Sequence, residues 1–141
     1  MRTRLLALAF SGLALFAAAP SEAQVVARID RTTQTMRVWV DGSYAYEWPV
    51  STGARGHATP TGSYRAQRLE KRYFSRKYDN APMHNAVFFH RGYAIHGTSY
   101  VSTLGQPASH GCVRLHPSNA AEFFELVRSR GMGRTRISIV R

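Results

Sequence analysis

The chain has 141 residues, of which 19 are Lys or Arg and 8 are Asp or Glu, so its formal net charge is +11. Hydrophobic residues make up 44% and charged residues 19%, a composition that excludes an intrinsically disordered chain and predicts one globular domain. The single cysteine excludes a fold held together by internal disulfides.

The first 23 residues have the pattern of a secretory signal peptide. Arg2 and Arg4 precede an apolar run over residues 5–19, and Ala23 is the small residue expected at a cleavage site. The run is shorter than the roughly 20 residues that a membrane-spanning helix needs. We therefore expect cleavage after Ala23 and export of residues 24–141 to the periplasm or cell envelope, with no membrane span. An uncleaved N-terminal anchor is the alternative.

The expected mature domain is strongly basic, and its cations are densest over residues 65–77. A basic surface attracts polyanions. For an exported protein these are envelope polymers or anionic lipid headgroups, so we expect no nucleic acid partner. A solvated basic surface without any one partner is the alternative. We expect the protein to be a monomer.

The pattern of side chains predicts a β-rich domain from Val25 onward. Residues 36–40 alternate between apolar and polar side chains, Asp41-Gly42 is typical of a hairpin turn, and residues 44–50 form the returning strand. Further elements predicted in chain order are a loop over 53–62, a strand over 62–69, a polar insertion over 70–83, and short strands over 86–89 and 93–96.

One helix is predicted near the C-terminal end. Pro117 marks its start and Gly131 its end. Its apolar face is expected to consist of Ala121, Phe123, Phe124 and Val127. Residues 135–140 alternate again and predict a closing strand. The whole pattern predicts one mainly β domain with a packed helix.

Cys112 and His96 are the candidate catalytic pair. An unpaired cysteine in an exported protein is a candidate reactive thiol, but a thiol with a pKa near ~8.5 needs help from a base. The imidazole of His96 could accept its proton or hold the thiolate as an ion pair. Gly111 allows a tight turn, so that the amides of Gly111 and Cys112 could donate to an oxyanion. A main-chain carbonyl such as that of Gly97 could orient His96.

These residues form a pattern similar to that of a known family. His96-Gly97-Thr98 followed by Ser109-His110-Gly111-Cys112-Val113-Arg114 resembles the active-site pattern of the L,D-transpeptidase catalytic domain. Residues 49–53 and 59–62 resemble that family's second recognisable stretch. The resemblance covers nearly all of residues 29–140 and implies a β-sandwich with one packed α-helix and a flap-like insertion over residues 70–83.

The resemblance implies peptidoglycan chemistry without a cofactor or a metal. Cys112 would form a thioester with the third residue of a tetrapeptide stem and release the terminal D-alanine. The acyl group would then pass to an amine acceptor during cell-wall biogenesis. The implied ligands are peptidoglycan stem peptides, and a carbapenem adduct on Cys112 is also expected.

The positions that match the family's pattern imply a role for each residue. His96 matches the base and Gly97 the carbonyl that orients it, while Gly111 and Cys112 match the oxyanion donors. The candidate substrate-binding residues are Ser109, His110, Arg114 and Thr98.

Three alternatives are weighed against this function. With water as the acceptor, the same acyl-enzyme would make the protein an L,D-carboxypeptidase or an amidase that releases proteins from peptidoglycan. A non-catalytic wall-binding module would not need the cysteine and histidine that are present. His110, Cys112 and His116 lie close in sequence, but their spacing matches no usual structural zinc pattern and a second cysteine is missing.

Overall fold

The computed structural model describes residues 22–141, so the predicted signal peptide lies almost entirely outside the described residues. Within residues 22–141, no helix is long and apolar enough to cross a membrane. The elements are β1 (Val25–Asp30), β2 (Thr35–Val40), β3 (Ser43–Ser51), β4 (Gly62–Arg65), β5 (Arg68–Glu70), β6 (Phe74–Ser75), β7 (Ala81–Pro82), β8 (His84–His90), β9 (Tyr93–Gly97), β10 (Val113–Leu115), α1 (Pro117–Arg130) and β11 (Thr135–Val140). The predicted mainly β fold with a packed helix is confirmed.

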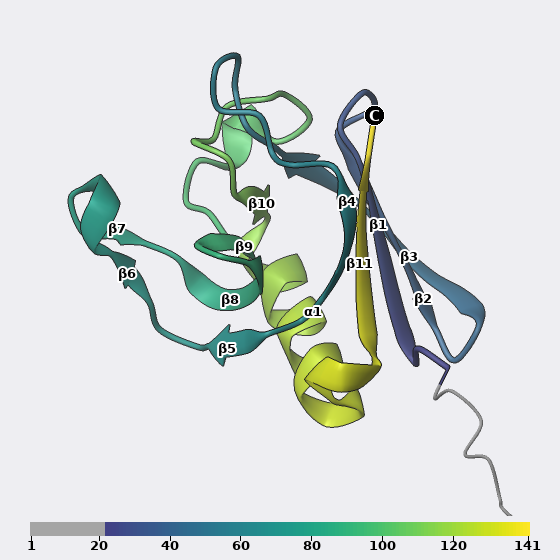
Figure 1. The fold of residues 1–141 in the computed structure, drawn as a ribbon. Helices are drawn as coiled ribbons and strands as arrows, with labels where there is room; N and C mark the ends of the chain where they lie inside the picture. Colours follow the sequence, from purple (N-terminus) through teal and green to yellow (C-terminus); the bar gives the residue numbers. More distant parts are fainter. Residues whose placement is uncertain (1–21) are drawn as a thin grey trace, which may run out of the picture.

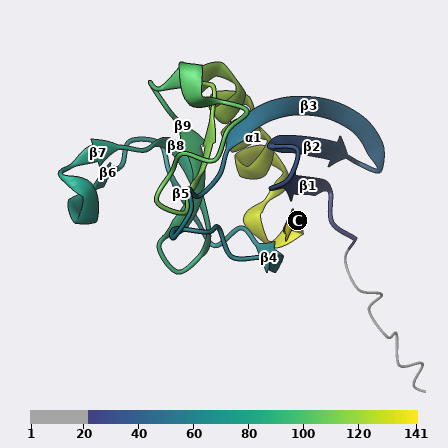
Figure 2. The same cartoon turned by 90° about the horizontal axis from the view of Figure 1, so that it is seen from above.

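Nine of the strands form one curled sheet in the order β4-β11-β1-β2-β3-β10-β9-β8-β5. The curl brings two halves of the sheet into separate layers, with β1, β2, β3 and β11 in one and β5, β8 and β9 in the other (Figures 1 and 2). Helix α1 packs on β8 and β9, and its buried side chains share one core with both layers. β6 and β7 form a small separate sheet that projects from the main one and lies within the predicted insertion.

The predicted hairpin is confirmed as β2 and β3. Asp41 (φ 49°) and Gly42 (φ 79°) both have positive φ, as the tight turn between twisted antiparallel strands requires. The predicted closing strand is β11. It pairs with β1 on one side and with β4 on the other, so it lies inside the sheet rather than at its edge.

The single strand predicted over residues 62–69 is wrong, because the structure contains two strands there. β4 pairs with β11 and β5 pairs with β8, at opposite ends of the nine-stranded sheet. Between them Ala66 is buried, and the amide of Gln67 donates to the Phe88 carbonyl (2.8 Å). The chain thus crosses from one layer to the other, and the alternation of side chains alone does not reveal this crossing.

Strand β10 was not predicted, since its three residues are too few to show a period. It nevertheless lies at the centre of the sheet, antiparallel to β3 and parallel to β9. Its position determines where the residue before it, Cys112, is held.

Helix α1 begins and ends as predicted, but its buried face differs by one residue. His116 accepts a hydrogen bond from the Ser118 amide at the N-terminus, and the Gly131 amide donates to the Val127 carbonyl at the other end. The buried residues are Ala120, Phe123, Phe124 and Val127. Ala120 therefore takes the place predicted for Ala121, which is only half-buried.

Ala120→Leu should lower the free energy of unfolding by about 1–3 kcal/mol, because added methylenes overpack a filled core. Ala120 is 1% exposed. Ala121→Leu makes the same chemical change one position later and should alter stability by no more than about 0.5 kcal/mol. Urea denaturation of both variants measures the difference, and equal losses would show that the buried face is misassigned.

Candidate active site

Strands β8, β9 and β10 have two faces, because successive side chains of a strand point to opposite sides. The face toward α1 carries the core residues Val87, Phe89, Ile95, Val113 and Leu115. The opposite face carries a second apolar cluster of Met83, Ala86, Phe88 and Ala94, against which Cys112 packs. His96 follows Ala94 by two residues and Arg114 follows Cys112 by two. The candidate nucleophile, the candidate base and Arg114 thus share the face turned away from the helix.

The parallel register of β9 and β10 sets the relative positions of His96 and Cys112. Arg114 pairs with His96, and Val113 with Ile95. One residue further back, Cys112 lies beside Ala94, so His96 is its diagonal neighbour on the same face. No hydrogen bond joins the two side chains within the described part of the chain. Catalytic hydrogen bonds are often long before substrate binds, so this geometry is compatible with proton transfer.

The ring of His96 is held by the backbone of the next residue. Its Nδ1 lies 2.8 Å from the Gly97 carbonyl oxygen, which can only accept, so Nδ1 carries the proton and Nε2 is the basic nitrogen. His96 is 5% exposed. Burial lowers its pKa to about 4, and the charge of Arg114 adds to this shift, while the bond to Gly97 opposes it. His96 is therefore neutral at pH 7.

The thiol of Cys112 is also neutral at pH 7. Cys112 is half-buried, and its Sγ lies 3.9 Å from the Gly92 carbonyl oxygen. Burial raises its pKa, and the Ala94 amide and the charge of Arg114 only partly oppose this effect. A neutral thiol next to a neutral imidazole favours proton transfer to His96 during attack over a thiolate–imidazolium pair formed in advance.

The loop that carries Cys112 is held by hydrogen bonds around Ser109. Ser109 Oγ donates to the Cys112 carbonyl (2.5 Å) and accepts from the Gly111 amide (3.0 Å). Gly111 has φ +126°, and a Cβ there would lie 2.5 Å from the Tyr93 ring. The Gly111 amide already donates to Ser109 Oγ. The role of Gly111 as an oxyanion donor therefore stays a prediction, and it requires this hydrogen bond to break. Among residues 22–141, nothing accepts a hydrogen bond from the Cys112 amide.

Thr59 holds this loop by a hydrogen bond to its backbone. The sequence patterns did not predict a role for this residue. Its hydroxyl donates to the Gly111 carbonyl (2.8 Å) and accepts from the Gly53 amide (3.0 Å), and the side chain is fully buried. Gly53 in turn forms a bridge with Ser109. The sequence signal was present, since Thr59 begins one of the stretches that resemble the family, but only the fold brings it to Gly111.

The four candidate substrate-binding residues lie in different surroundings. Ser109 and Thr98 are buried, and Thr98 Oγ1 accepts from the Tyr100 amide (3.0 Å), so both hydroxyls organise loops in this structure. Arg114 extends toward the Ala108 carbonyl (3.5 Å). Contact of any of the four with a substrate stays a prediction.

His110 is exposed and links the nucleophile loop to the insertion. Its ring stacks on Tyr78 of the insertion (centroids 4.7 Å apart, planes at 14°) and meets the ring of His57 edge-on (4.8 Å). Two segments far apart in sequence thus meet next to Cys112. Within the described residues, no cluster of three or more His, Cys, Asp or Glu could hold a metal ion.

Residues 24–139 match the family model of the L,D-transpeptidase catalytic domain (YkuD). Similar solved structures include an L,D-transpeptidase from Mycobacterium smegmatis, at 26% identity and a TM-score of 0.75 over 84% of this chain and 59% of that one. Another, from Stackebrandtia nassauensis, has 25% identity and a TM-score of 0.75 over 92% and 61%. The LD transpeptidase LdtMt1 in complex with imipenem has 25% identity and a TM-score of 0.74 over 84% and 59%.

The chain spans about three fifths of the length of these solved proteins. No match was found among curated proteins.

Thr59→Val should lower the free energy of unfolding by about 1–3 kcal/mol, because the isosteric change leaves the Gly53 amide and the Gly111 carbonyl without partners. Thr61→Val is the matched control, because Thr61 is exposed. This substitution should lower the free energy of unfolding by no more than about 0.5 kcal/mol. Urea denaturation measures both. A loss for Thr59→Val no larger than that for Thr61→Val would show that these bonds do not hold the loop.

Acid should destabilise the protein between pH 6.5 and about 4 through His96. In this interval the unfolded chain binds a proton that buried His96 excludes, so the free energy of unfolding falls as the pH is lowered. The shift corresponds to roughly 3 kcal/mol over the whole interval. His96→Gln cannot titrate and should flatten the profile by that amount. Denaturation curves across this pH range test the expectation, which fails if the two profiles have the same slope.

Proposed function

Because the chain belongs to the L,D-transpeptidase catalytic-domain family, we propose that it is a cysteine-dependent peptidoglycan L,D-transpeptidase. In this proposal Cys112 forms a thioester with the third residue of a tetrapeptide stem, releases D-alanine and transfers the acyl group to an amine. The place of action is the periplasm or cell envelope, where peptidoglycan lies. The export signal in residues 1–23 belongs to the same proposal.

The observation that carries the proposal is the bond between His96 Nδ1 and the Gly97 carbonyl. It fixes the tautomer in which Nε2 can accept a proton, on the sheet face that also carries Cys112. A base with a low pKa stays unprotonated at neutral pH, so it is ready to accept the thiol proton. This supports His96 as the general base.

In the first step, Cys112 Sγ attacks the carbonyl carbon of the third stem residue while His96 Nε2 takes the thiol proton. The tetrahedral intermediate carries its negative charge on the former carbonyl oxygen. The Cys112 amide is the donor best suited to that oxygen, since it has no other partner among the described residues. The intermediate collapses to the thioester, and His96 returns the proton to the leaving nitrogen of D-alanine.

In the second step, the acceptor amine attacks the thioester carbon and His96 takes a proton from the amine nitrogen. Collapse of this second intermediate forms the new amide bond, and the proton returns to Cys112. Water in place of the amine would give hydrolysis through the same acyl-enzyme. The insertion, which contacts His110 through Tyr78, is where we propose that acceptors are selected.

Incubation with imipenem or a tetrapeptide stem should add one mass adduct to the protein, located on Cys112. The solved complex of LdtMt1 with imipenem supports the choice of this carbapenem. Cys112→Ala should abolish the adduct, and His96→Ala should slow its formation by about 100-fold or more, because the general base is lost. Intact-mass spectrometry over time measures both effects.

Thr103→Ala is the control for general disturbance of the loop after β9, because it removes the hydrogen bond from Thr103 Oγ1 to the Tyr100 carbonyl (2.8 Å) and changes no candidate site residue, so adduct formation should stay close to the wild-type rate. An unmodified Cys112 in the folded wild-type protein would refute the enzymatic proposal. Product analysis with and without an amine acceptor then distinguishes transfer from hydrolysis, since only transfer yields the cross-linked or exchanged stem.

A further inference from the structure

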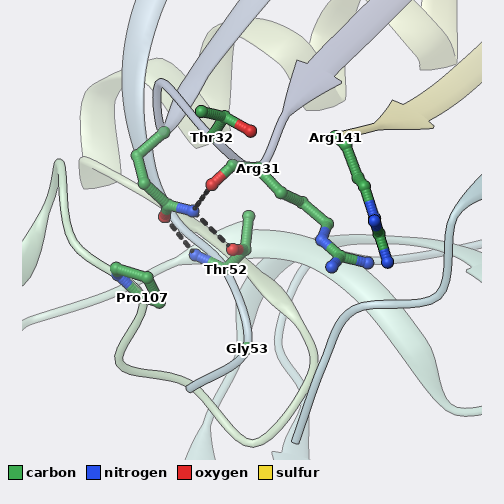
Figure 3. Close-up of a pocket in the computed structure, with 7 residues that line it drawn as sticks. Arg31, Thr32, Thr52, Gly53, Pro107 and Arg141 are labelled. Atoms are coloured by element: carbon green, nitrogen blue, oxygen red, sulfur yellow. Dashed lines mark hydrogen bonds between the residues drawn. The ribbon is translucent and has the colours of Figure 1, made fainter. Parts of the chain in front are cut away.

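A polar pocket of about 260 Å³ is lined in part by Thr52 and Gly53, and neither Cys112 nor His96 belongs to its lining (Figure 3). Its walls come from the ends of β1 and β11, from Thr52 and Gly53, and from Pro107. Arg31 and Arg141 both line it. The proposed transpeptidase reaction uses neither residue.

The two arginines are neighbours because of the sheet register. β1 and β11 run parallel, with Asp30 paired to Val140, and the amide of Arg31 donates to the Val140 carbonyl (3.0 Å). Arg31 and Arg141 are the next residues along each strand. Figure 3 shows both side chains among those that line the pocket.

Within residues 22–141, no ion pair joins either arginine to a carboxylate. The four ion pairs found in residues 22–141 use Arg37, Arg68, Arg128 and Arg130. The nearest acid in sequence, Asp30, instead accepts hydrogen bonds from the amides of Thr32 and Thr33. Both guanidinium groups are therefore available for an anionic ligand.

The pocket is organised before any ligand arrives. Buried Gln34 donates to the Arg31 carbonyl and to Thr52 Oγ1 (both 2.7 Å), and its side-chain oxygen accepts from the Thr52 amide (2.8 Å). Arg31 Nη1 donates to the Thr59 carbonyl (2.8 Å), which holds the guanidinium in place. A fixed wall and a fixed cation reduce the entropy lost when a ligand binds.

We propose that this pocket binds a phosphate group. Two guanidinium groups offer planar sets of N–H donors that match phosphate oxygens, and Thr32 adds a hydroxyl at the rim. A phosphate monoester carries about −1.5 to −2 charges at pH 7 and three strong acceptor oxygens, so it can accept from both guanidinium groups at once, whereas a carboxylate has only two oxygens.

The test is a titration of the folded protein with inorganic phosphate at constant ionic strength, in which isothermal titration calorimetry measures binding. We expect saturable one-to-one binding that Arg141→Gln weakens by about tenfold or more. We choose Arg141 for substitution because replacing Arg31 would also remove its hydrogen bond to the Thr59 carbonyl. Acetate at the same ionic strength should bind at least about tenfold more weakly than phosphate.

Arg136→Gln is the matched control. Arg136 lies on β11, the strand that ends just before Arg141, and it pairs with another arginine, Arg65; both are exposed. It should change phosphate affinity less than about twofold. An equal loss in both variants, or no saturable binding, would overturn the proposal, and acetate binding as tight as phosphate would overturn the assignment to phosphate. The titration needs no stem peptide or carbapenem, so its outcome is independent of the proposed acyl transfer.

Discussion

The parallel pairing of β9 and β10 is the constraint on which the candidate site depends. Each of these strands is short, and neither would be stable alone, but between β3 and β8 they are held by neighbours on both sides. Their register places Arg114 beside His96 and leaves Cys112 at the entry to β10. A shift of one residue would turn Cys112 toward the helix and Val113 out of the core. The core packed against α1 thus also fixes the orientation of Cys112, the candidate nucleophile.

Burial shifts the pKa values of the two candidate catalytic groups in opposite directions, and both shifts favour the uncharged form. It raises the pKa of the Cys112 thiol and lowers that of the His96 imidazole, so both side chains are neutral in the resting protein. The neutral thiol is the less costly form of Cys112 to keep against the apolar cluster of Met83, Ala86, Phe88 and Ala94. In the proposed reaction, the thiolate–imidazolium charges would develop only as a substrate is attacked, when oxyanion donors can offset them.

Local sequence patterns predicted the elements that have a clear period or a clear boundary. The β2–β3 hairpin followed from the Asp41-Gly42 turn, and α1 from Pro117 and Gly131. The same reasoning merged β4 and β5 into one strand and missed β10, because a crossing between layers and a three-residue strand leave no periodic signal. The buried face of α1 was displaced by one residue, from Ala120 to Ala121, because both are alanines and only packing against Gly97 distinguishes them.

By itself, the sequence determined the family resemblance, the mainly β class and the choice of Cys112 and His96, since these depend on residue types and spacings within short stretches. The tertiary structure decided which atoms support them. Thr59 reaches Gly111 across 52 positions, and Arg31 and Arg141 line one pocket because β1 and β11 are paired in parallel. Such contacts depend on strand register and on the curl of the sheet, which arise from the packing of the whole core rather than from any local run of residues.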